Sequence, residues 1–248
     1  MELQYYFKRI INSKIKLGVI LLIFLLPIID IIFMLKDIRM GGSVIVPDLA
    51  SFLSSTLFNG AQILFLWYLP IYFLILTSDD CIEDYHTGYK NILVSKFGRK
   101  KYFAINILKG FIFAFVAVFL SFILNLIMTN IIFSGGTYYL ENENILELLQ
   151  NGLIINIAYI LFVSFLSGIV SMGAVAVSMF LHNRYIVYPI VFILWYIPSS
   201  GTKSIILAMQ PFTEYSIIDL LPTVLLVIGI NIAAVISSYV KVIKYDKI

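Results

Sequence analysis

Six long apolar runs, separated by short charged connectors, fill most of this chain of 248 residues. A transmembrane helix needs roughly 20 apolar residues to cross a hydrocarbon core about 30 Å thick. The runs are residues 17–35, 59–77, 104–133, 153–181, 185–198 and 222–240. They lack the alternation of apolar and polar residues over about ten positions that is typical of β-barrel strands. The sequence therefore predicts an all-α membrane protein, with six transmembrane helices in a single transmembrane domain, residues 1–248.

The composition excludes a soluble domain. Hydrophobic residues make up 61% of the chain, charged residues only 12%, and the mean hydropathy is +0.99, whereas about 25% of the residues in an average soluble domain are charged. No polar domain follows the first run, so we expect this run to stay in the membrane and not to be a cleaved signal. The single cysteine, Cys81, cannot form an internal disulfide.

The distribution of Lys and Arg predicts the orientation, because basic residues close to the spans stay on the cytosolic side. Of the 17 basic residues, only Lys36, Arg39 and Lys203 fall in connectors on the other side. Both termini are therefore expected in the cytosol, in a multi-pass protein of the bacterial cell membrane. The net charge of +3 is explained by span-flanking bases that favour anionic membrane lipids, and it requires no nucleic-acid partner.

Three segments outside the runs have a predicted structure. Residues 1–16 form a short amphipathic interfacial helix, with Leu3, Phe7, Ile10 and Ile11 at helical spacing and bases between them. Residues 199–221 are apolar but broken by proline and glycine, which predicts an outer hairpin that is re-entrant or lies at the membrane surface. Residues 134–152 carry glutamates without a base, which predicts an acidic outer loop.

Two prolines inside the runs predict bends. Pro27 and Pro70 lie in the first and second runs. Proline removes a backbone donor and clashes with the preceding turn of a helix, so we expect a kink at each position.

The connector at residues 79–102 is dense in charge, with acids in its first half and bases in its second. Apolar residues recur in it at spacings of three or four: Ile82, Tyr85, Tyr89, Ile92 and Leu93. This pattern predicts a cytosolic amphipathic helix, whose stripe is covered by the inner leaflet or by the groove of a partner protein. The alternative is a solvated or lipid-lying loop with ordinary span-flanking charges.

The same connector resembles the segment between the second and third spans of type-2 ATP-binding cassette (ABC) permeases. That family has an acid four residues before the glycine of a Gly-Thr pair, then an apolar pair, a Pro-Ile-Ser-Arg-like turn and a lysine about ten positions on. The matching residues here are Glu83 or Asp84 for the acid, Gly88 for the glycine, Arg99 for the arginine and Lys109 for the lysine. Two departures are Tyr89 in place of threonine and Lys-Phe-Gly at 96–98 in place of the proline-containing turn.

The resemblance implies a permease subunit of an ABC exporter, formed by two copies of this chain or by one copy with a sister permease. Separate ABC ATPase subunits would bind ATP and Mg, and this chain would bind neither a cofactor nor a metal. The implied cargo is an amphipathic peptide, such as an antimicrobial or toxin peptide. The residues expected to couple the permease to the ATPase are Glu83, Asp84, Tyr85, Gly88 and Tyr89, and those expected to anchor it at the inner membrane interface are Arg99 and Lys109.

Asp30 is the only acid inside a run. An acid at the centre of a span costs about 2.5–3.5 kcal/mol on insertion scales. Asp30 is therefore either part of a translocation path or close to the outer interface.

Two other classes of function remain to be weighed. A membrane enzyme needs a nucleophile and base, or metal ligands, at depth, but both histidines, His86 and His182, are expected at the cytosolic face. We therefore expect neither catalytic nor metal-ligating residues. The remaining alternative is a standalone membrane immunity protein or channel that acts without an ATPase.

Overall fold

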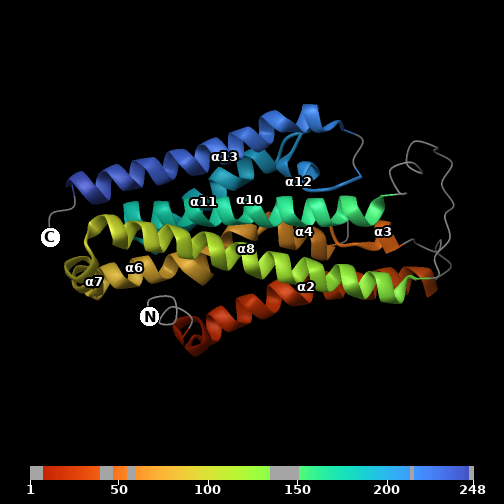
Figure 1. The fold of residues 1–248 in the computed structure, drawn as a ribbon, viewed down its shortest axis with the longest axis horizontal. Coiled ribbons are helices and arrows are strands. Elements are labelled where there is room, and N and C mark those ends of the chain that lie inside the picture. The colour runs from red at the N-terminus through yellow and green to blue at the C-terminus, as the bar shows by residue number, and fades with distance from the viewer. Residues whose placement is uncertain (1–7, 40–46, 55–59, 135–150, 213–214, 246–248) are drawn as a thin grey trace.

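The computed structural model describes residues 8–39, 47–54, 60–134, 151–212 and 215–245 (Figure 1). All regular structure in these ranges is helical, which confirms the all-α prediction. After a helical segment at residues 8–12, the elements are α2 (Lys14–Arg39), α3 (Pro47–Ala50), α4 (Gly60–Trp67), α5 (Leu69–Phe73), η1 (Leu74–Ser78), α6 (Asp79–His86), α7 (Tyr89–Phe97), α8 (Arg99–Ile132), α10 (Gly152–Leu181), α11 (Arg184–Ser199), α12 (Ile205–Ala208), α13 (Ile217–Val240) and η2 (Lys241–Tyr245).

Each of the six predicted runs coincides with helical structure, but the helices differ in their capacity to span. Within the described ranges, α2, α8, α10 and α13 are long and apolar enough to cross a membrane. Helix α4 and the helical segment from α5 to α6 are bent relative to each other, and they form a fifth candidate span if both belong to one crossing. Helix α11 has 16 residues, about 24 Å, which is less than a hydrocarbon core of about 30 Å. The chain is thus a multi-pass membrane protein with four to five candidate spans, against the six expected.

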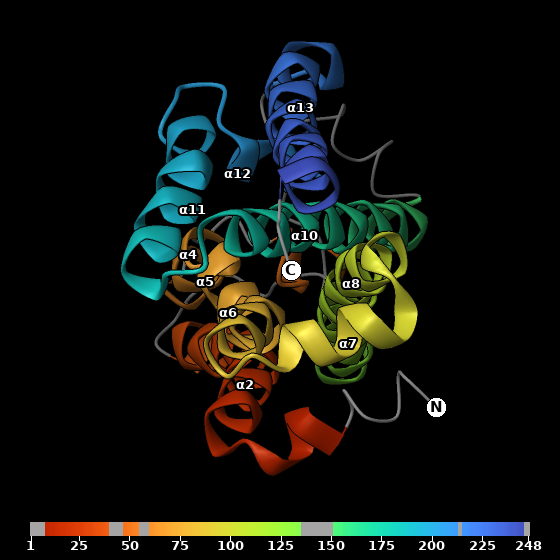
Figure 2. The ribbon, with the colours of Figure 1, turned by 90° about the vertical axis from the view of Figure 1, so that its left-hand side faces the viewer.

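Helix α10 lies at the centre of the bundle. In the end-on view of Figure 2, α13 lies on one side of it, and α8, α6 and α2 lie on the other. Small residues allow this close packing: a Cβ on Gly110 of α8 would meet Val175 of α10 at 2.8 Å, and a Cβ on Gly173 of α10 would overlap Asn231 of α13. The close contacts at these two glycines therefore join α10 to α8 and to α13.

The prolines of α2 and α5 leave backbone carbonyls that a neighbouring helix satisfies. Pro27 removes the donor for the carbonyl of Ile23, and Ser121 of α8 donates to that carbonyl at 2.7 Å. Pro70 likewise removes the donor for the carbonyl of Leu66. This carbonyl accepts instead from the indole N–H of Trp195 at 3.0 Å. The chain bends by 56° between α4 and the helices after it, which confirms the kink predicted at Pro70, whereas Pro27 lies within one continuous helix.

The segment at residues 50–54 is buried although it has little regular structure. Ala50, Ser51, Phe52, Leu53 and Ser54 are each at most 4% exposed. The backbone N–H of Phe52 donates to Asn125 of α8 at 2.9 Å, and the hydroxyls of Ser51 and Ser54 donate to Asn156 of α10 at 3.0 and 2.5 Å. Side-chain amides thus replace the water that would otherwise satisfy these groups.

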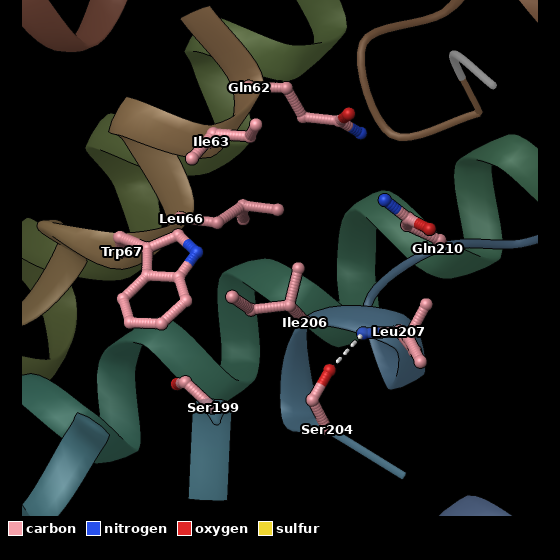
Figure 3. Close-up of a pocket in the computed structure, with 9 residues that line it drawn as sticks. All are labelled: Gln62, Ile63, Leu66, Trp67, Ser199, Ser204, Ile206, Leu207 and Gln210. Carbon is pink, nitrogen blue, oxygen red and sulfur yellow. Dashed lines mark hydrogen bonds between the residues drawn. The ribbon is translucent and has the colours of Figure 1, made fainter. Parts of the chain in front are cut away.

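The predicted outer hairpin contains α12, which is packed into the bundle. Ile205, Ile206 and Met209 are at most 9% exposed and belong to the main hydrophobic core. Between α4, the end of α11 and α12 lies a cavity of about 490 Å³, lined by Gln62, Trp67, Ile206, Leu207 and Gln210 among others (Figure 3). The hairpin is therefore covered by protein over its apolar part, as a re-entrant segment must be.

Two sequence predictions fall wholly or partly outside the described residues. Of the interfacial helix expected at 1–16, residues 8–12 are described and helical, with Ile10 buried and Ile11 exposed, while Leu3 and Phe7 lie outside. Residues 135–150, most of the expected acidic loop, also lie outside.

Candidate functional site

Helix α6 begins where the kinked second run ends. It follows the π-helical turn η1 directly, and Asp79 and Asp80 occupy its first turn, where acids interact favourably with the helix dipole. Gly88, with φ of +73°, ends α6 and starts α7, and Gly98, with φ of +81°, separates α7 from α8. Both backbone conformations favour glycine, so α6 and α7 form a hairpin of two short helices and not the single helix expected.

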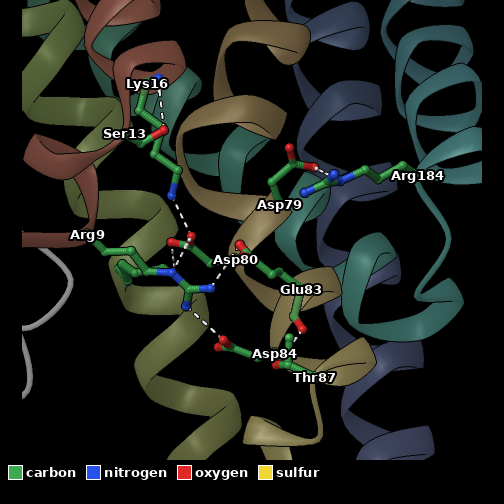
Figure 4. Close-up of polar contacts among 10 residues, drawn as sticks. Arg9, Ser13, Lys16, Asp79, Asp80, Glu83, Asp84, Thr87 and Arg184 are labelled. Carbon is green, nitrogen blue, oxygen red and sulfur yellow. Dashed lines mark hydrogen bonds and ion pairs between the residues drawn. The ribbon is translucent and has the colours of Figure 1, made fainter.

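Asp80 is the centre of a buried ionic cluster (Figure 4). Its Oδ1 accepts from Lys16 Nζ of α2 at 2.5 Å and lies 3.2 Å from Nε of Arg9, while its Oδ2 accepts from Lys109 Nζ of α8 at 3.2 Å. Asp80 and Lys109 are each 2% exposed, and Lys16 is 7% exposed. One carboxylate thereby joins α6 to α2, to α8 and to the segment before α2.

Arg9 extends the cluster along α6. Its two terminal nitrogens donate to Asp84 at 2.7 Å and to Glu83 at 3.0 Å. Burial alone would lower the pKa of Arg9, but the charges of Asp80, Asp84 and Glu83 raise it above its usual value. Arg9 is therefore always charged, and its planar fork suits two carboxylates at once.

The charges in this cluster balance. The carboxylates of Asp80, Glu83 and Asp84 face the cations of Arg9, Lys16 and Lys109. Burying an ion is costly unless its charge is matched and hydrogen-bonded, and this neutral set meets that condition. It fixes the position of α6 without an exposed net charge.

The other side of α6 contacts the connection between α10 and α11. Asp79 accepts from Nε of Arg184 at 3.2 Å, and the ring of Tyr85 stacks on His182 with the centroids 3.8 Å apart. His86 Nε2 donates to the carbonyl of His182 at 2.9 Å. Helix α6 is thus bonded to α2 and α8 on one side, and to α11 and the residue that follows α10 on the other.

The structure places the predicted coupling residues on two different faces. Glu83 and Tyr85 are exposed, and Gly88 and Tyr89 are partly exposed, but Asp84 is 1% exposed and turned inward to Arg9. Asp84 therefore lies within the chain, away from the surface that a partner would touch. The apolar stripe predicted on residues 82–93 is likewise divided between buried and exposed positions.

On that stripe, Ile82 is buried at 2% exposure, whereas Ile92 is 61% exposed on α7. Leu93 packs against the core beneath. Only part of the pattern is thus available to a partner.

The two predicted interface anchors also differ. Arg99 is partly exposed at the start of α8 and donates to the carbonyl of Ile243 at 3.4 Å. Lys109 is 2% exposed and bonds to the buried carboxylate of Asp80, so its side chain lies inside the bundle. Asp30 is fully buried in α2 and is not among the residues that line the cavity between α4 and α12.

Arg9, Lys16 and Asp80 are central to the site but were not singled out from the sequence. The available signal was the pair of acids at 79 and 80, next to a kinked run and opposite a basic N-terminal segment. Across the described part of the chain, no group of His, Cys, Asp or Glu is arranged to hold a metal ion, and Cys81 is a buried free thiol.

Comparison with known proteins places the chain in a family. No family model matches it, and no solved structure matches it either. The chain is 33% identical over 256 aligned residues to a protein of Bacillus subtilis (strain 168) described as "Uncharacterized protein YybM", and the alignment covers 100% of both. The chain therefore belongs to the family of the bacterial protein YybM.

Proposed function

We propose that this multi-pass membrane protein is the permease subunit of an ATP-driven ABC exporter. The observation that carries the proposal is the α6–α7 hairpin, which is bonded on its buried side to α2, α8, α10 and α11 and presents Glu83, Tyr85 and Ile92 on its exposed side. An element with these two sides can receive a displacement from a partner and pass it to the spanning helices. A solvated loop has no need of the buried ionic cluster.

The proposed topology has six spans, with α11 as a short fifth span and both termini in the cytosol. Support comes from the arrangement in Figure 1, where α7, the start of α2 and the end of α13 lie at the same end of the molecule. This end carries the basic connectors, which are retained in the cytosol. The hairpin would then face a cytosolic ATPase.

In this proposal, ATP and Mg bind to the ATPase, and closure of the ATPase dimer moves the hairpin. Ile92 is the main apolar contact, Glu83, Tyr85 and Tyr89 are further contacts, and Gly88 provides the turn between the two helices. Asp84 acts inside, through Arg9. The conformations of the permease are biased by contacts that differ between them, as in any ligand-driven switch.

The proposed cargo is an amphipathic peptide, and the functional unit contains either two copies of this chain or one copy with a sister permease. A long, largely uncovered α13 and the apolar surfaces of α2 leave room for both lipid and a second permease. The alternative is a standalone immunity protein or channel, which needs no ATPase.

The test is co-purification of an ATPase subunit with the tagged chain after mild detergent extraction. Ile92→Glu places a charge on the exposed apolar contact and should weaken the complex about tenfold or more, as loss of an interface hot spot does. Asn12→Glu adds the same charge at an exposed position of the same end and should leave the complex intact. If the wild-type chain extracts as a lone stable oligomer without an ATPase, the permease proposal fails and the standalone alternative holds.

A further inference from the structure

A groove follows one face of α8 at the end of the molecule where α8 begins and α13 ends (Figure 1). Its volume is about 640 Å³, and α8 lines it with residues 100, 103, 104, 107, 108 and 111. This spacing of three and four places all of them on a single helix face. Met172 of α10 and Tyr239 of α13 complete the lining, and the ring of Tyr239 lies 5.4 Å from that of Phe103. The groove therefore lies where α8, α10 and α13 meet.

The length of this groove matches one leaflet of a bilayer. From Lys100 to Phe111, α8 rises about 16 Å at about 1.5 Å per residue, and one leaflet of a hydrocarbon core about 30 Å thick measures about 15 Å. Phe103 and Ile107 are at most 8% exposed, whereas Leu108 is 57% exposed. The groove thus has a buried, apolar base and an open side that faces lipid, and it fits an acyl chain of that leaflet.

Lys100 places a positive charge at the end of the groove nearest the start of α8. Its side chain is exposed, and among the described residues it takes part in no ion pair. Arg99 and Lys101 adjoin it in sequence, and Lys244 follows α13 at the same end. The sequences of α8 and α10 contain no acid, and the acid of α13, Asp219, lies in its first turn, at the opposite end of that helix. The charge around this end of the groove is therefore positive.

The charge selects which lipid fits. An acyl chain by itself gives no selection, because every membrane lipid carries one. The headgroup of phosphatidylcholine contains its own cation, whereas that of phosphatidylglycerol leaves the phosphate charge uncompensated. One base at the membrane surface favours an anionic lipid by about fivefold. A free phosphate ion would meet the same base but has no apolar part to fill the groove, so the combination of groove and base favours an anionic lipid.

We propose that this groove binds one anionic glycerophospholipid, with an acyl chain against Phe103, Ile107 and Phe111 and the headgroup phosphate on Lys100. Basic pockets between transmembrane helices bind anionic headgroups in this way. The bound lipid fills the space between α8 and α13 at one end of the bundle. The inference goes beyond the proposed transport function, because it requires neither an ATPase nor a cargo.

The test uses the full chain in nanodiscs of phosphatidylcholine that contain a trace of a photoreactive lipid. The two probes, phosphatidylglycerol and phosphatidylcholine, carry the same acyl chain with a diazirine at its middle. At low salt, we expect the phosphatidylglycerol probe to label residues 103–111, Met172 and Tyr239 about fivefold more than the phosphatidylcholine probe does. The preference should shrink as salt is added, because Lys100 is exposed and its charge is screened.

Matched variants separate the role of the charge from that of the groove. Lys100→Gln should lower the labelling ratio of the two probes about fivefold, whereas Lys100→Arg keeps the charge and should retain the ratio. Lys96→Gln removes one charge from an exposed position of α7 and should leave the ratio almost unchanged. Ala104→Phe fills the groove from an exposed position and should suppress labelling by both probes, while Val116→Phe, exposed on α8 outside the groove, should not.

Equal labelling by the two probes would overturn the proposal and indicate ordinary boundary lipid. Labelling spread evenly over the exposed faces of α2, α8 and α13 would overturn it as well. An equal loss of preference in Lys100→Gln and Lys96→Gln would also refute it, because the preference would then come from the summed charge of this end and not from the groove. No ATPase takes part in these measurements, so their outcome and that of the co-purification test are independent.

Discussion

Neutralising the carboxylate of Asp80 tests whether the buried cluster fixes helix α6. Asp80→Asn keeps the size and shape of the side chain but removes its charge. Three cations would then face two carboxylates, and both of these, Glu83 and Asp84, bond to Arg9. Lys16 and Lys109, at 7% and 2% exposure, would lose the carboxylate that they share.

The expected loss of stability is large because the cations stay buried. Removing one partner of a buried ion pair costs about 3–5 kcal/mol. For a chain of this size each kcal/mol lowers the melting temperature by about 2–4 °C, so the variant should melt roughly 6–20 °C below the wild type. Glu83→Gln is the matched control: Glu83 lies on the same helix and bonds the same arginine, but its side chain is 55% exposed, and an exposed pair contributes less than about 1 kcal/mol.

Cys81 provides the assay. It is the single cysteine of the chain, it lies next to Asp80 and is 1% exposed, so a fluorogenic maleimide reacts with it only when α6 is released. The dye signal should rise at the lower temperature in Asp80→Asn, and a second change, Lys16→Met, should recover more than half of the loss by restoring the charge balance. If Asp80→Asn and Glu83→Gln melt within about 2 °C of each other, the cluster does not hold α6, and the electrostatic argument for the hairpin is wrong.

Two further predictions concern the bundle. Ser121→Ala should destabilise the chain by about 1–3 kcal/mol in chemical denaturation, because the carbonyl opposite Pro27 loses its donor; in a Pro27→Ala background the helix regains its own donor, and the same change should cost less than half as much. Gly173→Ala should lower the melting temperature by several degrees, because the added methyl group overlaps Asn231, while Gly229→Ala, with open space around it, should leave the temperature unchanged or raise it. Equal effects at the two glycines would contradict the packing of α10 against α13.

Much of the fold could be predicted because it depends on local sequence. Uncharged runs of the length of a span form helices in lipid, since only internal hydrogen bonds satisfy the backbone there, and the bend at Pro70 follows from the chemistry of one residue. The break at Gly88, by contrast, divides the single helix that was expected there into α6 and α7. The buried segment at 50–54 was not predicted, because its burial depends on Asn125 and Asn156, which come from distant parts of the chain.

The acids of α6 show where local reasoning ends. Helical spacing identifies which residues share a face, but it does not say which face is covered. Asp80 and Asp84 are turned inward because Arg9 and Lys109 approach from elements about 75 and 29 residues away. Glu83, between them in sequence, remains exposed. The same spacing is compatible with an acidic docking surface, and only the tertiary contacts distinguish the two.

Proline gives a more specific rule for polar residues inside a membrane domain. A proline at position i removes the donor for the carbonyl at i−4, so Pro27 and Pro70 create a demand for one donor each in the sequence itself. Ser121 and Trp195 meet it. These two polar side chains thus have a structural role, although their place inside apolar runs would otherwise suggest a translocation path.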